Sequence, residues 1–312
     1  MMKIDVVIPW VDGNDPVLKA KKASYGDAKA LSRADVGGET RYSNLGEIHW
    51  CIASINRFAP FVNRIFIVTD GQDPGVESRI PVEIVDHKVI FSGHEDCLPV
   101  FNSYSIETLI WNIPSMSEHF LLMNDDFVLT APVSPADFFG PGGEVFCYGR
   151  RKSSLWASFV YWLSVLKYGY ARSTFKKSLI IGSRMGGSRR NFFYLVHTPR
   201  PLLKSVFREY FEKNPEAVTS NIRHRFRNPA HFQSQALEYA LLDGRKQLKL
   251  VDSSDKLLFL QHWKGADYVS GKISRAAAKH TLRFACFNSL DEASPEERAV
   301  VAEWIEKLLK EV

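Results

Sequence analysis

Short apolar runs alternate along the first half of the chain with segments in which apolar residues recur at every third or fourth position. The runs, which are rich in β-branched residues, predict buried strands at residues 4–11, 64–71 and 119–126, and a further strand within residues 82–91. The helical spacing predicts helices at residues 44–60 and 103–113, each of which stops at a proline. Strands that alternate with helices indicate an α/β fold, in which helices flank a mainly parallel sheet.

Two further helices are predicted toward the carboxyl end. Thr198 is a good N-cap and Pro199 a good first residue for a helix with an apolar stripe behind them. Residues 294–312 open with Ser294 and Glu297 at the spacing of a capping box, and an apolar stripe follows. We expect this last segment to be a helix that packs on the domain.

The composition is that of an ordinary globular protein, because 45% of the 312 residues are hydrophobic and 24% are charged. Residues 1–312 show no repeats or low-complexity linkers and are expected to form a single domain. The four cysteines lie far apart and without zinc-ligand spacing, which disfavours a disulfide framework and a structural zinc and fits a reducing cytosol. The first residues, with Asp5 and Pro9 inside the apolar run, do not resemble a signal peptide.

Positive charge is concentrated in one part of the chain. Residues 145–208 contain 13 Lys or Arg and no Asp or Glu, whereas the whole chain has a net charge of only +5. This distribution predicts an anionic partner. Within it, residues 150–195 are predicted to be a basic, aromatic, helical insertion in the domain. Residues 155–166 are apolar but too few to span a bilayer, so they predict either an interfacial helix on an anionic membrane or a buried helix with a basic rim.

Polar residues occur where the predicted strands end, and ligands of parallel α/β sheets bind at that edge. They are Asp12 and Asp15 after the first strand, Asp70 and Gln72 after the second, His87 in the third, and Asn124, Asp125 and Asp126 after the fourth. A carboxylate pair between apolar runs suits a hard divalent cation, which would neutralise a diphosphate. Asp12 and Asp15 also suit ordinary turn chemistry, and His87 suits a structural hydrogen bond.

The chain contains, in this order, the blocks IDVVIPWVDGNDP, RYSNLGEIHWCIASINRFAPFVNRIFIVTDGQDP, LPVFNSYSIET with IPSMSEHFLLMNDDFVLTAPVSPADFF, HTPRPLLKSVFREYF with IRHRFR, and FACFNSLDE. As an ordered set they resemble the conserved regions of the Stealth family. That family contains bacterial capsular and exopolysaccharide hexose-1-phosphate transferases and the catalytic part of the lysosomal-enzyme N-acetylglucosamine-1-phosphotransferase. The resemblance implies a Rossmann-like, glycosyltransferase A-like fold that binds a nucleotide sugar, and makes the single domain a catalytic one.

The resemblance implies a phosphotransferase that moves a sugar 1-phosphate from a nucleotide diphosphate sugar, expected to be UDP-linked, to a saccharide or lipid-linked saccharide, with Mg²⁺ or Mn²⁺. The acceptor hydroxyl attacks the sugar-proximal phosphorus, and a nucleoside monophosphate such as UMP leaves. No nucleic-acid partner is expected. The protein is expected in the cytoplasm, with peripheral contact to the inner face of an anionic membrane.

Residue roles follow from the same resemblance. Asp125, Asp126 and Asn288 match metal-binding residues of the family, and Asp126 is also expected to be essential for catalysis. Ser289 stands where the family usually has Asp, and Asp291 is a candidate to replace that carboxylate.

His197 matches the histidine proposed as the catalytic base, and a place just outside a helix N-terminus would keep its imidazole neutral. Arg227 best fits the phosphate-contacting arginine by its distance from His197. Arg225 and Arg223 are its close competitors, although Arg223 is expected to be solvated. Asn102 and Glu107 complete the predicted substrate-binding set.

Two other functions remain open. An ordinary metal-dependent glycosyltransferase would attack the anomeric carbon and release UDP instead of UMP. A non-catalytic polyanion-binding protein would account for the basic segment but not for the Asn-Asp-Asp run at residues 124–126. His49 and Ala53 stand where relatives carry arginines, which predicts a different sugar if those arginines contact donor or acceptor.

Overall fold

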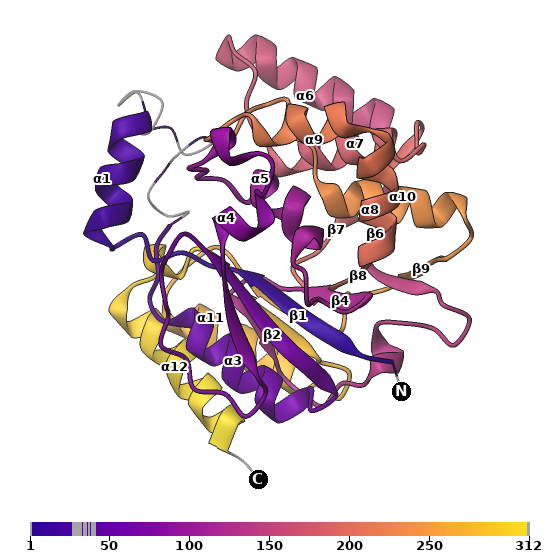
Figure 1. The fold of residues 1–312 in the computed structure, drawn as a ribbon. Helices are drawn as coiled ribbons and strands as arrows, with labels where there is room; N and C mark the ends of the chain where they lie inside the picture. The colour runs from indigo at the N-terminus through magenta and orange to yellow at the C-terminus, as the bar shows by residue number, and fades with distance from the viewer. Residues whose placement is uncertain (1, 27–32, 34–35, 37, 39–41, 311–312) are drawn as a thin grey trace.

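The computed structural model describes residues 2–26, 33, 36, 38 and 42–310. At its centre is a five-stranded sheet with the strand order β3-β2-β1-β4-β8 (Figure 1). Its strands are β1 (Ile4–Pro9), β2 (Val62–Thr69), β3 (Val82–Asp86), β4 (His119–Leu122) and β8 (Arg200–Leu203). The first four are parallel, and β8 is antiparallel to β4. This order is Rossmann-like and confirms the predicted α/β class.

Two smaller sheets adjoin the central one. The first has the order β10-β11-β5 and consists of β5 (Phe127–Leu129), β10 (Leu257–Leu260) and β11 (Phe284–Phe287). The second has the order β7-β6-β9 and consists of β6 (Val145–Ser153), β7 (Asn191–Leu195) and β9 (Leu248–Val251). Both sheets mix parallel and antiparallel pairs.

Helices surround these sheets. Those in the first half of the chain are α1 (Pro16–Tyr25), α3 (Glu47–Phe58), α4 (His87–Ile90) and α5 (Ser103–Leu109), with 3₁₀ turns at η2 (Glu95–Cys97), η3 (Ile110–Asn112) and η4 (Pro135–Asp137). Those in the second half are α6 (Ser154–Tyr168), α7 (Phe175–Met185), α8 (Lys204–Lys213), α9 (Pro215–Ile222), α10 (Ser234–Gly244), α11 (Ala266–Ala277), η5 (Leu290–Glu292) and α12 (Pro295–Lys310). Throughout the described part of the chain, no helix combines the length and the apolarity needed to cross a membrane.

The helices form layers on the central sheet. In Figure 1, α3, α11 and α12 lie together on one side of it, and α8 and α10 lie on the other. Helix α3 buries Ile48, Ile52 and Ile55, which recur at helical spacing and form one face. Because both faces of the sheet are covered, its strands are continuous apolar runs rather than alternating ones.

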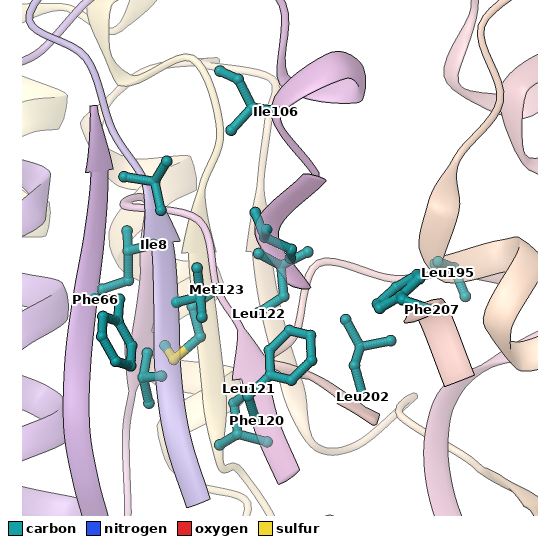
Figure 2. Close-up of a cluster of buried hydrophobic side chains, with 14 of the residues drawn as sticks. Ile8, Phe66, Ile106, Phe120, Leu121, Leu122, Met123, Leu195, Leu202 and Phe207 are labelled. Carbon is teal, nitrogen blue, oxygen red and sulfur yellow. The ribbon is translucent and has the colours of Figure 1, made fainter. Parts of the chain in front are cut away.

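The core beside β4 shows how this covering works (Figure 2). Phe120 of β4 is fully buried, and its ring centroid lies 6.3 Å from that of Phe207 on α8. Leu202 of β8 is paired with Phe120 in the sheet and is buried as well. Each such side chain contributes roughly 1.5–3 kcal/mol by leaving water, so β4 and the edge strand β8 are held by packing as well as by backbone hydrogen bonds.

Several predicted helices are confirmed. Helix α3 lies within the predicted range 44–60, and α5 and η3 together cover most of the predicted range 103–113. Helix α12 begins at Pro295, and the Glu297 N–H donates the predicted capping hydrogen bond to Ser294 Oγ at 3.2 Å. Residues 311 and 312, the end of that last prediction, and Arg41, the start of the second family block, lie outside the described residues.

The helix predicted to start at Pro199 is wrong in its first turn. Arg200–Leu203 is a strand, and the helix α8 begins only at Lys204. Pro201 explains the difference, because a proline disfavours helical backbone in the residue before it. A proline is tolerated in β8 because this strand is at the edge of the sheet.

The third predicted strand lies within residues 82–91, but His87 was wrongly placed in it. β3 ends at Asp86, whose carboxylate Oδ1 accepts a hydrogen bond from the Lys88 N–H at 2.8 Å and so caps the short helix α4. His87 is therefore the first residue of α4 rather than part of a strand.

Candidate active site

The Asn-Asp-Asp run joins two sheets. β4 ends at Leu122, and the chain then leaves the central sheet and enters β5 at Phe127. The carboxylates therefore occupy a crossing between two buried strands, which explains the apolar residues on both sides of them. At this crossing the carbonyl oxygen of Asp126 accepts a hydrogen bond from the Phe287 N–H at 3.3 Å. Because β11 is antiparallel to β5, Asn288 follows directly beside the carboxylate pair.

Both carboxylates are poorly solvated. Burial, reinforced by the other carboxylate, raises the pKa of Asp125 well above its usual value. Burial also raises the pKa of Asp126, to about 6. Asp126 Oδ2 accepts a hydrogen bond from the Cys286 thiol at 3.4 Å, while its Oδ1 is buried and has no partner among the described residues. Two adjacent carboxyl groups that are costly to ionise, one with a free buried oxygen, form a place that a cation would stabilise.

The neighbouring residues contribute few further ligands. Asn288 Nδ2 donates to Ser289 Oγ at 2.7 Å, which leaves the amide oxygen of Asn288 available. Ser289 adopts a left-handed conformation with φ 56°, and its carbonyl oxygen accepts from Trp263 Nε1 at 2.8 Å. Asp291 lies one turn further on, in η5. Within the described ranges no group of three or more His, Cys, Asp or Glu side chains could hold a metal ion, so a cation here would need oxygens from water or from a bound phosphate.

His197 lies in the loop between β7 and β8, packed among aromatic rings. Its imidazole stacks on Phe259 with ring centroids 4.5 Å apart, and the rings of Phe127 and Phe175 lie 6.2 Å away. Phe127 directly follows Asp126, and the charge of Arg200 acts on both His197 and Asp126, so Arg200 is a common neighbour of the histidine and the carboxylate pair. The enclosure lowers the pKa of His197 to about 4, chiefly by burial and secondly through the positive charge of Arg200.

This imidazole is neutral at physiological pH for a reason other than the predicted one. The strand β8, not a helix N-terminus, follows His197, so the predicted helix does not supply the effect. Its Nδ1 is buried without a hydrogen-bond partner in the part of the chain described. A neutral ring that lacks an internal partner can accept a proton from a bound molecule.

Arg200 is a functional candidate that sequence reasoning missed. It pairs with Leu122 across the sheet, at the end of β4 where the Asn-Asp-Asp run begins, and is only 5% exposed. Its guanidinium carbon lies 5.9 Å from the ring centroid of Phe127, and its Nε has no partner among described atoms. In the sequence it is one of many basic residues in a basic segment, and only the strand pairing shows that it is buried at the site.

Glu107 lies near both Arg200 and Arg227. Burial raises the pKa of Glu107, and the positive charges of Arg200 and Arg227 partly oppose this. Glu107 Oε2 accepts from Gln235 Nε2 at 2.7 Å. Arg227 lies over the ring of Tyr104, 4.7 Å from its centroid, and its one hydrogen bond to the described residues is a long one of 3.5 Å from Nη2 to Ser103 Oγ. Its guanidinium is therefore available to a ligand.

The other residues predicted in this region have internal partners. Arg225 Nη2 donates to the carbonyl oxygens of Asp96 and Leu98 at 3.1 and 3.2 Å, so it holds a loop. Asn102 is the N-cap of α5 and also donates to the carbonyl oxygen of His224 at 2.8 Å. Arg223, expected to be solvated, is exposed.

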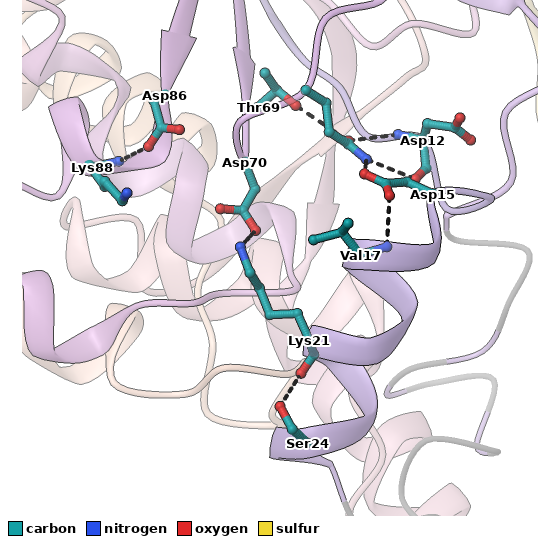
Figure 3. Close-up of polar contacts among 10 residues, drawn as sticks. Asp12, Asp15, Val17, Lys21, Ser24, Thr69, Asp70, Asp86 and Lys88 are labelled. Atoms are coloured by element: carbon teal, nitrogen blue, oxygen red, sulfur yellow. Dashed lines mark hydrogen bonds and ion pairs between the residues drawn. The ribbon is translucent and has the colours of Figure 1, made fainter.

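A second group of predicted residues lies at the ends of β1, β2 and β3 (Figure 3). Gln72 Nε2 donates to Asp15 Oδ2 at 2.9 Å, and Gln72 Oε1 accepts from the Asp12 N–H at 3.0 Å. Asp15 Oδ1 accepts from the Val17 N–H at 2.8 Å, which makes Asp15 the N-cap of α1. The hydrogen bond from Gln72 is the first cause of the lowered pKa of Asp15. Both carboxylate oxygens of Asp15 are thus used internally.

Asp70 and His87 complete this second group. Asp70 Oδ2 forms an ion pair with Lys21 Nζ at 2.6 Å (Figure 3). His87 is buried, and neither ring nitrogen has a partner within the described structure. Burial lowers its pKa to about 4, against the nearby negative charges of Asp70 and Asp86. His87 is therefore uncharged at neutral pH, and within the described structure it lacks the hydrogen bond expected of a structural histidine.

Glu47 is a further residue that was not predicted. It opens α3, is 8% exposed, and its Oε2 accepts from the Leu45 N–H at 2.7 Å. Its negative charge adds to the burial that raises the pKa of both Asp125 and Asp126. The site thus combines buried acidic groups with two arginines: the charge of Arg200 acts on both Asp126 and Glu107, and that of Arg227 acts on Glu107. This arrangement suits a cation and a phosphate together.

Comparison with known proteins identifies the family. Residues 2–30 match Stealth protein CR1, conserved region 1, and residues 41–146 match Stealth protein CR2, conserved region 2. The capsular polysaccharide phosphotransferase WcwK of Streptococcus pneumoniae is 35% identical over 256 residues, which cover 74% of this chain and 75% of WcwK. The receptor polysaccharide phosphotransferase WefC of Streptococcus oralis is 34% identical, and the match covers 74% of this chain and 75% of WefC. The exopolysaccharide phosphotransferase CpsY of Mycobacterium tuberculosis is 31% identical, and the match covers 78% of this chain and 45% of CpsY. The chain therefore belongs to the Stealth family, as its conserved blocks predicted.

Proposed function

We propose that this protein transfers a sugar 1-phosphate from a nucleotide diphosphate sugar to a hydroxyl group of a saccharide during capsular or exopolysaccharide synthesis. The names of its relatives support a polysaccharide phosphotransferase. The observation that carries the proposal is a neutral, partnerless histidine and a buried carboxylate pair that have Arg200 as a common charged neighbour. UDP is the proposed carrier of the donor sugar.

The chemistry needs one proton acceptor. His197 takes the proton of the acceptor hydroxyl as its oxygen attacks the sugar-bearing phosphorus of the donor. The new oxygen–phosphorus bond forms while the bond from that phosphorus to the bridging oxygen breaks, and the bridging oxygen leaves with the nucleoside monophosphate. The product is a phosphodiester between donor sugar and acceptor.

Asp125, Asp126 and the amide oxygen of Asn288 are the residues that would hold Mg²⁺ or Mn²⁺. The free buried oxygen of Asp126 and the raised pKa of both carboxyl groups fit a divalent cation. When bound, the cation would neutralise negative charge on the diphosphate. Asp291 is proposed to replace the carboxylate missing at Ser289, because its charge acts on Glu47, whose charge in turn acts on Asp125 and Asp126.

Arg227 and Arg200 are proposed to contact phosphate oxygens. We expect Arg227→Ala to weaken donor binding and turnover together, by about tenfold to a hundredfold, because a guanidinium can bind two phosphate oxygens at once. Arg227→Lys should restore only part of the loss. Titration of the donor and steady-state kinetics measure both effects. Arg223→Ala, which removes an exposed arginine from the same segment, is the matched control and should behave like the wild type.

We further propose that the acceptor is a lipid-linked saccharide and that the enzyme acts at the inner face of the cytoplasmic membrane. The basic segment of the chain, which contains no acidic residue, supports this location.

The leaving nucleotide tests the proposed reaction. With a UDP-sugar donor we expect UMP and a phosphodiester product, both of which chromatography and phosphorus NMR identify. UDP together with a glycosidic product would instead indicate a glycosyltransferase. Salt-sensitive binding of polyanions without any turnover would indicate a binding protein.

A further inference from the structure

Helix α6 exposes its apolar side chains to solvent. Leu155, Trp156 and Leu166 are 71%, 68% and 61% exposed, and Trp162, Phe159 and Leu163 are 54%, 48% and 45% exposed. The aromatic rings form a continuous row, with centroids 5.8 Å apart between Trp156 and Phe159 and 6.0 Å apart between Phe159 and Trp162. An exposed apolar patch of this kind marks an interaction site.

The opposite face of α6 attaches the helix to the protein through small and polar residues. Ser154 and Ala157 are buried. The hydroxyl of Tyr161 donates to the carbonyl oxygen of Arg172 at 2.9 Å, and Arg184 Nη2 donates to Ser158 Oγ at 3.1 Å. The helix is thus oriented with its polar side inward and its apolar side outward, the reverse of a surface helix in a soluble protein. The sequence also allowed a buried helix with a basic rim, and the exposure of the apolar side chains of α6 is inconsistent with that alternative.

Basic residues surround this apolar face. Arg150, Arg151 and Lys152 precede the helix at the end of β6, and Lys167 and Lys176 follow; all five are exposed. Arg151 is paired with Asp243 and Arg150 lies 3.9 Å from Asp252, but the segment 145–208 itself contains no acidic residue. Exposed aromatic residues between basic ones fit the interface of an anionic lipid bilayer, where rings enter the headgroup region and cations contact lipid phosphates.

The length of α6 fits a helix that lies along a bilayer rather than across it. Its 15 residues extend over about 22 Å at ~1.5 Å per residue, less than the ~30 Å of a hydrocarbon core. Figure 1 shows α6 at the upper edge of the molecule, beyond α7 and away from the central sheet. Nothing in the described part of the chain covers its outer face.

We propose that α6 is a docking helix that binds an anionic membrane through Trp156, Phe159 and Trp162, with the flanking Lys and Arg residues against lipid phosphates. Docking would also orient the candidate active site. Phe175, the first residue of α7, lies 6.2 Å from the ring of His197, and only residues 169–174 separate α7 from α6. The orientation of the active site rests on the proposed function, because it assumes that docking brings a lipid-linked acceptor toward the base. The binding of α6 to the membrane does not rest on the proposed function.

Co-sedimentation of the purified full chain with vesicles tests the docking. We expect binding to vesicles of phosphatidylcholine with phosphatidylglycerol, weaker binding to phosphatidylcholine alone, and a decrease as salt is raised. The triple variant Trp156→Gln, Phe159→Gln, Trp162→Gln should lose binding by at least about tenfold. A control triple variant at exposed apolar residues elsewhere, Val17→Gln, Val89→Gln and Leu250→Gln, should bind like the wild type.

The design separates this proposal from the reaction. Circular dichroism should show that both triple variants are folded, and both should retain sugar-phosphate transfer to a water-soluble acceptor. Asp126→Asn, which is expected to be inactive, should still bind vesicles like the wild type. Docking is overturned if the wild type does not bind anionic vesicles or if the aromatic variant binds them equally well. It is also overturned if sedimentation velocity shows a wild-type dimer that the aromatic variant cannot form, since a second copy would then cover α6.

Discussion

Asp126→Asn is expected to reduce turnover by at least about a thousandfold while leaving the protein folded, because the carboxylate charge that we propose holds the cation would supply several kcal/mol of transition-state stabilisation. The substitution preserves the shape of the side chain. It also removes one of two adjacent carboxyl groups that are costly to ionise, so the melting temperature without cation should be unchanged or higher.

Thermal unfolding with added Mn²⁺ provides a readout that does not depend on activity. The wild type should gain melting temperature as Mn²⁺ is added, and Asp126→Asn should lose that gain. Asp267→Asn, which removes an exposed carboxylate from the first turn of α11, is the matched control and should keep both the gain and the activity. A folded Asp126→Asn protein with near wild-type turnover would show that Asp126 lies outside the active site.

His197→Phe is expected to reduce the chemical step by about a hundredfold to ten-thousandfold with donor affinity within a few-fold of the wild type. Phenylalanine keeps an aromatic ring against Phe259 but has no nitrogen, so it removes the base and retains most of the packing. His197→Ala removes both. Equal losses of rate in the two variants would attribute the effect to the base, whereas activity in the Phe variant alone would attribute it to packing.

The pH profile gives the second readout for His197. The neutral imidazole is the active form, so the rate falls as the pH drops through its pKa. An ordinary histidine would place this fall in the range of roughly 5 to 8, whereas burial lowers the pKa of His197 to about 4. With saturating cation, we therefore expect kcat/KM to stay level to about pH 5 and to fall below it. A fall centred near 6.5 that persists in His197→Phe would place the base elsewhere, with Asp12, Asp15 and His87 the next residues to test.

Much of the fold was predictable because its strands and helices have strong local patterns. β1 and β2 are uninterrupted apolar runs, and α3 has a regular apolar stripe that ends before Pro60. α1 was missed because it buries only Leu18 and so has no stripe to detect. The start of α8 was misplaced because Thr198 and Pro199 suit a helix start, whereas pairing with β4 and Pro201 make the next residues a strand.

The candidate site was predictable from the sequence only in part. Asp125 and Asp126 stood out because carboxylates interrupt an apolar run, but their link to Asn288 depends on β11 pairing with β5, which are distant in the chain. Arg200 and Glu47 were not recognised because isolated charged residues carry no local signal. Asp15 and Asn102 were identified as polar residues at element ends, and the structure shows that both are N-caps.

The pairing of β5 with β11 also affects how the enzyme matures during synthesis. All five strands of the central sheet precede Lys204, whereas Phe259 against the proposed base and Asn288 beside the carboxylates come from β10 and the residue after β11. A chain emerging from the ribosome can therefore assemble its central sheet before either residue has been translated. We expect such a nascent chain to be catalytically silent, so that the proposed donor is not consumed until translation is nearly finished.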